Sequence, residues 1–257
     1  MSRDVIGWVC FLGLTVSMWA ATAAAQTGEP AAAVVVDGVA IDGPAPPSPP
    51  DISSRDAQDR VTIRAIRLKE GLKIDGQLDE EIYQTYLPAN GFIQREPKSG
   101  QPATEKTDLW IAFDSDNIYL TVRCWDSHPE RWVVNEMRRD NNNIPRNENV
   151  AFFFDTFYDR RNAFLFEINP IGGFYDTQVT NEKIGGTDWN PVWQRKTGRF
   201  QGGWAVEAAI PFKSLRYKPG ASQVWGFQMR RTIRWKNEET FLTRLPQLGG
   251  SGSGGIL

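Results

Sequence analysis

Hydrophobic and polar residues alternate along much of the chain. Leu109, Ile111 and Phe113 occupy every second position, and the Asp-rich segment 114–117 separates this run from a second alternating run at 118–124. A period of two places successive side chains on opposite faces, as in a half-buried β-strand. The two runs are therefore predicted to form a β-hairpin.

Further short runs with this period are separated by turns rich in Gly, Pro and Asp, and the predicted helices are short. Since no long amphipathic helix is available to cover a parallel sheet, the pattern favours antiparallel pairing. We expect an all-β fold, an antiparallel β-sandwich of jelly-roll type with a few short helices. The other predicted strands are 151–155, 163–169, 174–180, 192–196, 203–210 and 223–235, and the predicted helices are 79–86, 129–137 and 211–217.

The segment KIDGQLDEEIY, residues 73–83, lies near the start of the predicted sandwich. Asp75-Gly76 favours a tight turn because glycine accepts a positive φ. Asp79 is a suitable N-cap, since its carboxylate can accept the free amide hydrogens of the first helical turn. The segment therefore predicts a turn followed by a short helix.

The first residues have the pattern of a cleavable secretory signal peptide. Arg3 precedes an apolar run at 5–21, and small residues at 23–25 end the segment. The apolar run is also nearly long enough to span a bilayer, so a membrane anchor is the competing interpretation. We expect residues 1–25 to be a signal peptide that is removed on export.

The composition changes on both sides of the alternating region. Residues 26–60 are rich in Ala, Val and Pro, include PAPPSPP and lack apolar periodicity, so they are predicted to be a disordered tether. Residues 248–257 are mainly Gly and Ser, and we expect a linker that leads into a further C-terminal region. The folded module is predicted to span residues 61–247.

Charge and cysteine content narrow the classes of protein. A formal net charge of −2 gives no reason to expect nucleic-acid binding, which requires a basic surface. Cys10 lies in the predicted signal peptide, which leaves Cys124 as the sole cysteine of the exported chain and allows no internal disulfide. Cys124 continues an alternating run, so a buried strand thiol is the favoured interpretation.

No group of residues in the sequence forms a recognisable catalytic site. The single histidine, His128, lies in a polar turn without Ser or Cys partners of recognisable context. Carboxylates are numerous enough to supply a glycosidase pair, but turns account for Asp114, Asp116 and Asp155. No phosphate-binding loop, zinc spacing or dinucleotide fingerprint is present. We expect a binding protein rather than an enzyme.

An ordered set of segments resembles the carbohydrate-binding module family 9 domain. The resemblance covers residues 64–245, and its specificity comes from the order and spacing of the segments. NNNIPRNENVAFFFDTFYDRRNAFLFEINP and DWNPVWQ are similar to the version of this domain at the N-terminus of large exported bacterial proteins whose remainder is predicted to be an outer-membrane β-barrel. The segments are IDGQLDEEIY, DLWIAFDSDNIYLTVRCWD, NENVAFFFDT, GGWAVEAAIPFKSL and QVWGFQMRR.

The resemblance implies a non-catalytic carbohydrate-binding module of an exported bacterial envelope protein, linked to polysaccharide binding or breakdown. Its partners would be a poly- or oligosaccharide and a C-terminal β-barrel region of the same protein. The expected location is the periplasm or the outer membrane, or outside the cell. The alternative is an interaction or gating domain of the barrel protein that has kept the fold and lost sugar binding.

Sugar recognition requires flat aromatic faces and fixed polar groups, because pyranose rings have apolar faces rimmed by hydroxyls. Trp132 and Trp189 lie in polar loops, where ligand contact and loop packing are equal alternatives. The resemblance implies three further candidates. Asn169 matches a position that bonds sugar hydroxyls, Glu167 replaces a basic residue of the family, and Phe241 lies near the position of a stacking tryptophan.

Two other positions bear on the implied site. Sugar-binding members carry a tryptophan just before the NENVAFFFD strand, where this chain has Ile144-Pro145, so one stacking face is expected to be missing. Asp126 ends a strand, matches an acidic residue of the family and is the candidate ligand for a structural calcium ion. A solvated strand end or a salt bridge to a nearby arginine is the competing interpretation of Asp126. No other cofactor is expected.

Overall fold

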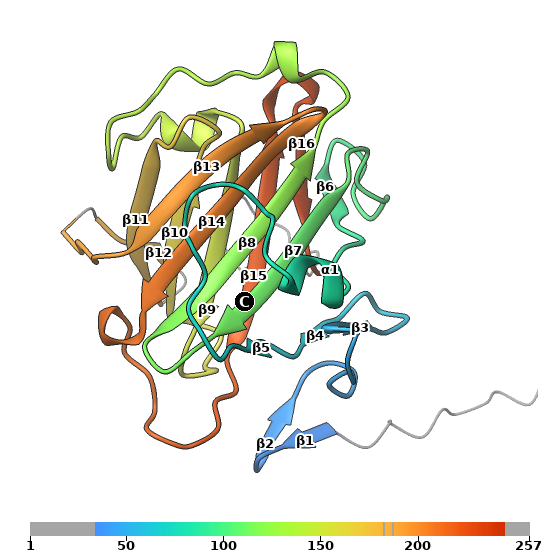
Figure 1. The fold of residues 1–257 in the computed structure, drawn as a ribbon, viewed down its shortest axis with the longest axis vertical. Helices are drawn as coiled ribbons and strands as arrows, with labels where there is room; N and C mark the ends of the chain where they lie inside the picture. Colours follow the sequence, from blue (N-terminus) through green and yellow to red (C-terminus); the bar gives the residue numbers. More distant parts are fainter. Residues whose placement is uncertain (1–33, 182, 187, 245–257) are drawn as a thin grey trace, which may run out of the picture. The chain divides into compact units, whose positions relative to one another are not determined.

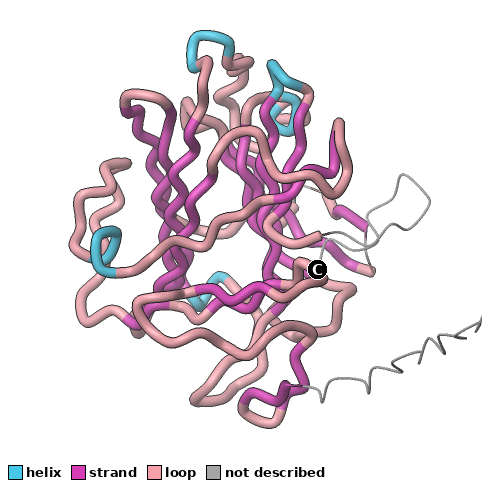
Figure 2. The backbone as a smooth tube through the Cα atoms, turned by 90° about the vertical axis from the view of Figure 1, so that its right-hand side faces the viewer, coloured by secondary structure: helices cyan, strands magenta, loops and turns pink. Residues whose placement is uncertain are grey.

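The computed structural model describes residues 34–181, 183–186 and 188–244. Within these ranges the strands form two large sheets in separate layers, as Figure 2 shows, and two small two-stranded sheets. The structure confirms the predicted all-β sandwich. The predicted signal peptide, residues 1–25, and the predicted linker, residues 248–257, lie outside the described residues.

The larger sheet has seven strands, and every pair in it is antiparallel. The predicted strands 151–155, 163–169, 174–180 and 223–235 are confirmed as four of its members. In spatial order the strands are β12 (Lys183–Ile184), β11 (Phe174–Thr180), β10 (Ala163–Ile168), β9 (Asn149–Asp155), β15 (Gly226–Ile233), β16 (Glu238–Phe241) and β6 (Ile93–Glu96).

The smaller sheet has five strands and lies in front in Figure 1. Its β7–β8 hairpin is the one predicted from the alternating pattern, and the short β5 pairs with β7 in parallel. In spatial order the strands are β13 (Gln194–Phe200), β14 (Gly203–Pro211), β8 (Asn117–Trp125), β7 (Thr107–Phe113) and β5 (Ile66–Arg67).

Two short hairpins precede the sandwich. The first joins β1 (Val34–Val36) to β2 (Val39–Ile41), and the second joins β3 (Ser53–Arg55) to β4 (Val61–Ile63). They place secondary structure inside residues 26–60, which we expected to form a disordered tether. Between β2 and β3, Ile52 is buried and packs with the sandwich residue Ile66. Burial of one apolar side chain and pairing with β4 therefore fix part of a Pro-rich stretch.

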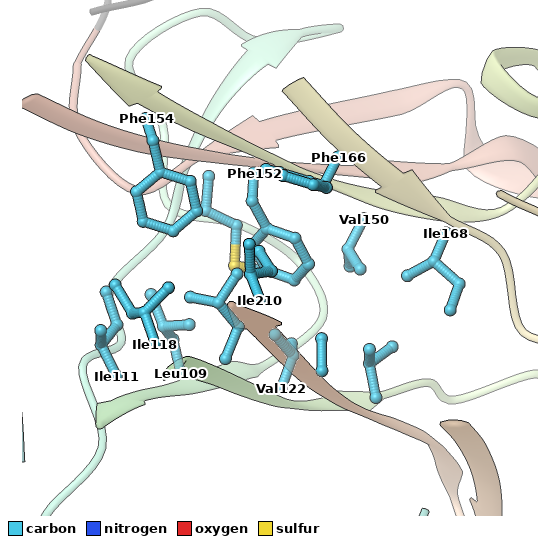
Figure 3. Close-up of a cluster of buried hydrophobic side chains, with 14 of the residues drawn as sticks. Leu109, Ile111, Ile118, Val122, Val150, Phe152, Phe154, Phe166, Ile168 and Ile210 are labelled. Carbon is cyan, nitrogen blue, oxygen red and sulfur yellow. The ribbon is translucent and has the colours of Figure 1, made fainter. Parts of the chain in front are cut away.

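The core lies between the two sheets. In Figure 3, Phe152 and Phe166 from the seven-stranded sheet face Leu109 and Val122 from the five-stranded sheet. The period of two creates this interior, because alternate residues of each strand point into it. Cys124 is also buried in the core, as predicted, and burial raises the pKa of its thiol to about 12. The thiol is therefore structural.

The outer face of the five-stranded sheet is covered by the segment that contains the predicted Asp75-Gly76 turn. This segment crosses in front of the sheet in Figure 1 and packs apolar side chains, including Ile74, against it. The buried carboxylate of Glu207 accepts hydrogen bonds from the backbone N–H groups of Asp75, at 3.0 Å, and Gly76, at 2.8 Å. It also accepts a hydrogen bond from the Tyr83 hydroxyl at 3.0 Å. Three donors thus compensate for the burial of one carboxylate.

Two glycines allow the turn to approach the sheet closely. Gly76 has a φ of +85°, as a tight turn requires. A Cβ atom on Gly198 of β13 would lie 1.9 Å from the Gly76 carbonyl oxygen. The contact between this turn and β13 therefore requires glycine at position 198.

The helices differ from the prediction in extent. Helix α1 is only Ile82–Thr85, with Glu81 at the N-cap and no capping side chain, so the predicted cap at Asp79 is wrong. The predicted helix 129–137 is reduced to the 3-10 turn Pro129–Arg131, and the predicted helix 211–217 to the turn Phe212–Ser214. Other 3-10 turns are Ile144–Arg146 and Arg234–Lys236. None of the helices in the described ranges has the length and apolarity needed to cross a membrane.

Candidate functional site

A cavity of about 600 Å³ lies at the outer edge of β13, with which no other strand of the described residues pairs; its volume is within the range of small-ligand sites. Because β13 is an edge strand, side chains from both of its faces can border the same space. The cavity combines an apolar wall with groups that can bond sugar hydroxyls. The wall consists of Ile74, Ile168 and Ile171, and the polar side chains include Gln194, Lys196 and Thr197.

Arg195 is the most unusual side chain of this cavity. Its guanidinium carbon lies 3.1 Å from the ring centroid of Phe174 and 4.8 Å from that of Trp193. One terminal nitrogen donates to the Trp193 carbonyl at 3.3 Å, while Nε is buried without a hydrogen-bond partner in the described residues. Burial lowers the pKa of Arg195 to about 10, so the side chain is still a cation at neutral pH.

The carboxylates nearest to Arg195 are engaged elsewhere. Asp176 on β11 accepts a hydrogen bond from Arg139 at 2.9 Å and one from the Trp193 indole at 3.1 Å. Asp140 pairs with the same Arg139 at 3.0 Å. The charges of Asp176 and Asp140 therefore partly offset the effect of burial on the pKa of Arg195, but Arg195 forms no ion pair with any described residue.

Trp193 fixes the start of β13. Its indole packs edge-on against Phe166, at a centroid distance of 5.1 Å, and against Phe174, at 5.7 Å. Only 5% of the residue is exposed, so the ring supports the cavity from below and offers no open face for stacking. β13 then runs from Gln194 to Phe200 along β14, so it begins two residues later and ends four residues later than the predicted strand 192–196. The cavity is thus built on β13, which is held at its start by the Trp193 indole and near its end by the contact between Gly198 and Gly76.

A second, smaller cavity of about 370 Å³ lies before β9. Its lining includes Asn135, Glu136, Arg138 and Asn147. Glu136 forms a two-point pair with Arg138, at 3.0 and 2.8 Å, and these hydrogen bonds lower the pKa of the Glu136 carboxyl to about 2. All of its lining residues are polar or charged, and none is aromatic.

Asn169, one of the predicted sugar contacts, lies beneath this second cavity and is fully buried. Its amide nitrogen donates to the Glu136 carbonyl at 2.6 Å. Its amide oxygen accepts from the backbone N–H groups of Ile171, at 3.2 Å, and Gly173, at 2.9 Å. In this structure Asn169 organises the β10–β11 turn, and its bonding groups are already used.

Two other predicted contacts are also buried. Glu167 is paired with Arg230 at 2.9 Å, although its burial raises the pKa of the carboxyl. Phe241 on β16 is 3% exposed and presents no face to solvent. Ile144, which stands where the resemblance implies a stacking tryptophan in sugar-binding members, is fully buried. It packs in a hydrophobic cluster with Phe153.

The two loop tryptophans are half-buried. Trp189 packs against Phe164 and Phe166, at centroid distances of 5.0 and 5.5 Å. Trp132 lies under the Arg199 guanidinium at 5.3 Å, and its indole N–H is buried without a partner in the described ranges. Both rings therefore contribute to packing at the edge of the core.

Asp126, the predicted calcium ligand, is buried at the end of β8. Its carboxylate accepts hydrogen bonds from the backbone N–H of His128 at 2.8 Å and from the Trp235 indole, and it lies 3.8 Å from the Arg231 guanidinium. Among the described residues, no group of three or more His, Cys, Asp or Glu side chains is arranged to hold a metal ion. The salt-bridge interpretation of Asp126 is the one for which the structure provides a partner.

The predicted site residues are thus spread over the molecule. Within the described part of the chain, no two of the six share a hydrogen bond, ion pair or aromatic contact. Arg195 and Gln194, which border the larger cavity, were not predicted. A signal for them was available, because Gln194, Arg195 and Lys196 are polar or charged residues within the expected strand 192–196 rather than in a turn.

Solved structures provide the comparison for this fold. A family 9 carbohydrate-binding module from Caldicellulosiruptor kristjanssonii in complex with cellotriose matches with a TM-score of 0.50 and 17% identity, over 72% of this chain and 86% of that chain. A family 9 carbohydrate-binding module from the same organism in complex with glucose matches with a TM-score of 0.50 and 18% identity, over 72% of this chain and 88% of that chain. No protein-family model and no curated protein matches the sequence.

A protein from Bacteroides uniformis, described as a candidate carbohydrate-binding protein, matches with a TM-score of 0.54 and 11% identity, over 75% of this chain and 93% of that chain. Identities this low establish a shared fold and nothing finer. The described part of this chain is therefore a β-sandwich with the fold of carbohydrate-binding module family 9.

Proposed function

We propose that the chain is a non-catalytic carbohydrate-binding module of an exported bacterial envelope protein. The observation that carries the proposal is the cavity at the edge of β13, where an apolar wall meets Gln194, Arg195 and Lys196. Structures with the same fold contain cellotriose and glucose, which makes saccharides the first ligand class to test. The mechanism is binding without chemistry, and the alternating sequence with its export pattern supports this role.

The direct test is calorimetry of the purified chain, residues 26–257, with glucose, cellotriose and a panel of plant and bacterial oligosaccharides. We expect saturable heat with at least one saccharide, and Gln194→Ala should weaken it by roughly 5- to 50-fold through loss of hydrogen bonds to hydroxyls. Each titration is run with calcium and with a chelator. Calcium-dependent heat that Asp126→Asn abolishes would support the predicted calcium site, whereas unchanged heat would reject it.

A second candidate function is an interaction or gating domain of the larger protein. It is favoured by the burial of Asn169, Glu167 and Phe241 and by the absence of an aromatic face in the smaller cavity. The same titrations separate the two functions. If no saccharide in the panel produces heat, carbohydrate binding is rejected and the interaction role becomes the better account.

A further inference from the structure

The larger cavity carries positive charge that no acid in its lining balances. Arg195 and Lys196 both border it, and none of its lining residues is Asp or Glu. The nearby Asp176 and Asp140 share Arg139 as their ion-pair partner. A neutral sugar would leave this excess of charge unused, whereas an anionic ligand would pair with it.

The geometry of Arg195 favours a carboxylate in particular. A guanidinium presents several N–H donors in one plane and binds carboxylates through two parallel hydrogen bonds. The Phe174 and Trp193 rings hold this plane in place, so little side-chain freedom is lost on binding. The apolar wall around Ile74 and Ile171 can cover the C–H face of a sugar ring beside the carboxylate.

We infer that the cavity at the edge of β13 selects an acidic saccharide, with the carboxylate of a uronic acid residue paired with Arg195. Lys196 adds a second, exposed charge, and Gln194 and Thr197 bond the ring hydroxyls. This inference rests on the proposed function, because it names the class of saccharide for the same site. It assigns charge recognition to β13 residues that were not among the predicted contacts.

The test compares three trisaccharides on the native chain: trigalacturonate, its methyl ester and cellotriose. The methyl ester keeps the rings and removes the charge. We expect trigalacturonate to bind on the order of 10- to 100-fold more tightly than the ester, the range for a hydrogen-bonded charge. Its affinity should fall as salt rises, because salt screens the exposed Lys196 charge. Acetate, which has the carboxylate without a ring, should compete only weakly.

Variants locate the effect. Arg195→Gln should abolish the preference for the acid over the ester, and Lys196→Gln should reduce it. Arg67→Gln on β5, at the opposite edge of the same sheet, is the matched control and should leave it unchanged. Near-UV circular dichroism checks folding. If Arg195→Gln does not fold, the comparison of acid and ester on the native chain, together with Lys196→Gln, still decides.

The outcomes also separate the two proposals. Equal affinity for acid, ester and cellotriose would overturn the acidic preference and leave carbohydrate binding standing. A preference that survives Arg195→Gln and Lys196→Gln would overturn the assignment to this cavity. The absence of heat with all three trisaccharides overturns the acidic preference, and the proposed function falls with it only if the wider panel is also silent.

Discussion

Buried charges are concentrated at the end of β8, where single residues control local stability. Arg231 of β15 is fully buried and donates to the Lys106 and Trp125 carbonyls, at 2.9 and 2.6 Å, so it joins the two sheets. Next to it, Glu148 is 1% exposed and accepts the backbone N–H of Arg234 at 2.8 Å. Burial raises the pKa of Glu148 to about 7, and the Asp126 charge adds to the effect.

Glu148 should make stability fall as the pH rises from about 4.5 to about 7. In this window the unfolded chain has already lost the proton, whereas the native protein still holds it. The native state therefore binds more protons, and deprotonation favours unfolding. Glu148→Gln keeps an acceptor for Arg234 and removes the titration. Relative to the native chain, the stability of the variant should increase by about 2 kcal/mol between pH 5 and pH 7.

Urea unfolding at pH 5, 6 and 7 measures this gain. Other buried carboxyls, such as Glu207 and Asp176, titrate equally in both proteins and cancel in the difference. Glu70→Gln is the control, because it makes the same chemical change at an exposed position. A constant difference for Glu148→Gln would show that Glu148 is not the titrating group.

Among the elements, β13 makes a different kind of contact on each of its two faces. Its interior-facing positions carry Arg195 and Arg199, which stack on Phe174 and Trp132, and its outer face receives the Asp75-Gly76 turn at Gly198. The strand is therefore positioned by side chains on one face and by a backbone contact on the other. A change at Gly198 should be transmitted to both.

Gly198→Ala should lower the free energy of unfolding by about 1–3 kcal/mol, because its Cβ would collide with the Gly76 carbonyl and push the turn off the sheet. Thermal and urea unfolding measure the loss, and hydrogen exchange at Gly76 should increase. Gly186→Ala is the matched control, since the nearest atom to its Cβ would be 3.8 Å away. Equal stability of the two variants would contradict a rigid contact at Gly198.

The sequence predicted elements well where the period of two was uninterrupted, as in the β7–β8 hairpin and β9. It missed short strands such as β6 and β16, because four residues are too few to establish a period. It failed at the site for a different reason. Asn169 and Phe241 match or lie near binding positions in a linear comparison, but the tertiary structure decides burial, and here both side chains are buried.

At the scale of the whole molecule, the sandwich is assembled from distant segments. Asp155 of β9 pairs with Gly226 of β15, and Trp125 of β8 pairs with Gly203 of β14. Such non-local pairing requires large loops to close before stabilising contacts form. The interior therefore depends on pairings that no local stretch of sequence specifies.

Refolding should accordingly take milliseconds to seconds, the range typical of β-sandwiches. Stopped-flow tryptophan fluorescence after dilution from urea measures the rate, since Trp193 and Trp204 report burial in the core. Trp204→Phe, which removes one reporter, should change the amplitude more than the rate. Complete refolding within microseconds would contradict a topology dominated by distant pairs.

The free edge of β13 also bears on self-association. An edge strand exposes unpaired backbone groups to which a strand from another molecule can add, and lysine or arginine side chains discourage such pairing. Arg195, Lys196 and Arg199 supply three cations along this edge. Arg195 and Lys196, which we propose select the ligand, would thus also keep copies of the protein apart together with Arg199, so neutralising the three charges should promote aggregation through β13.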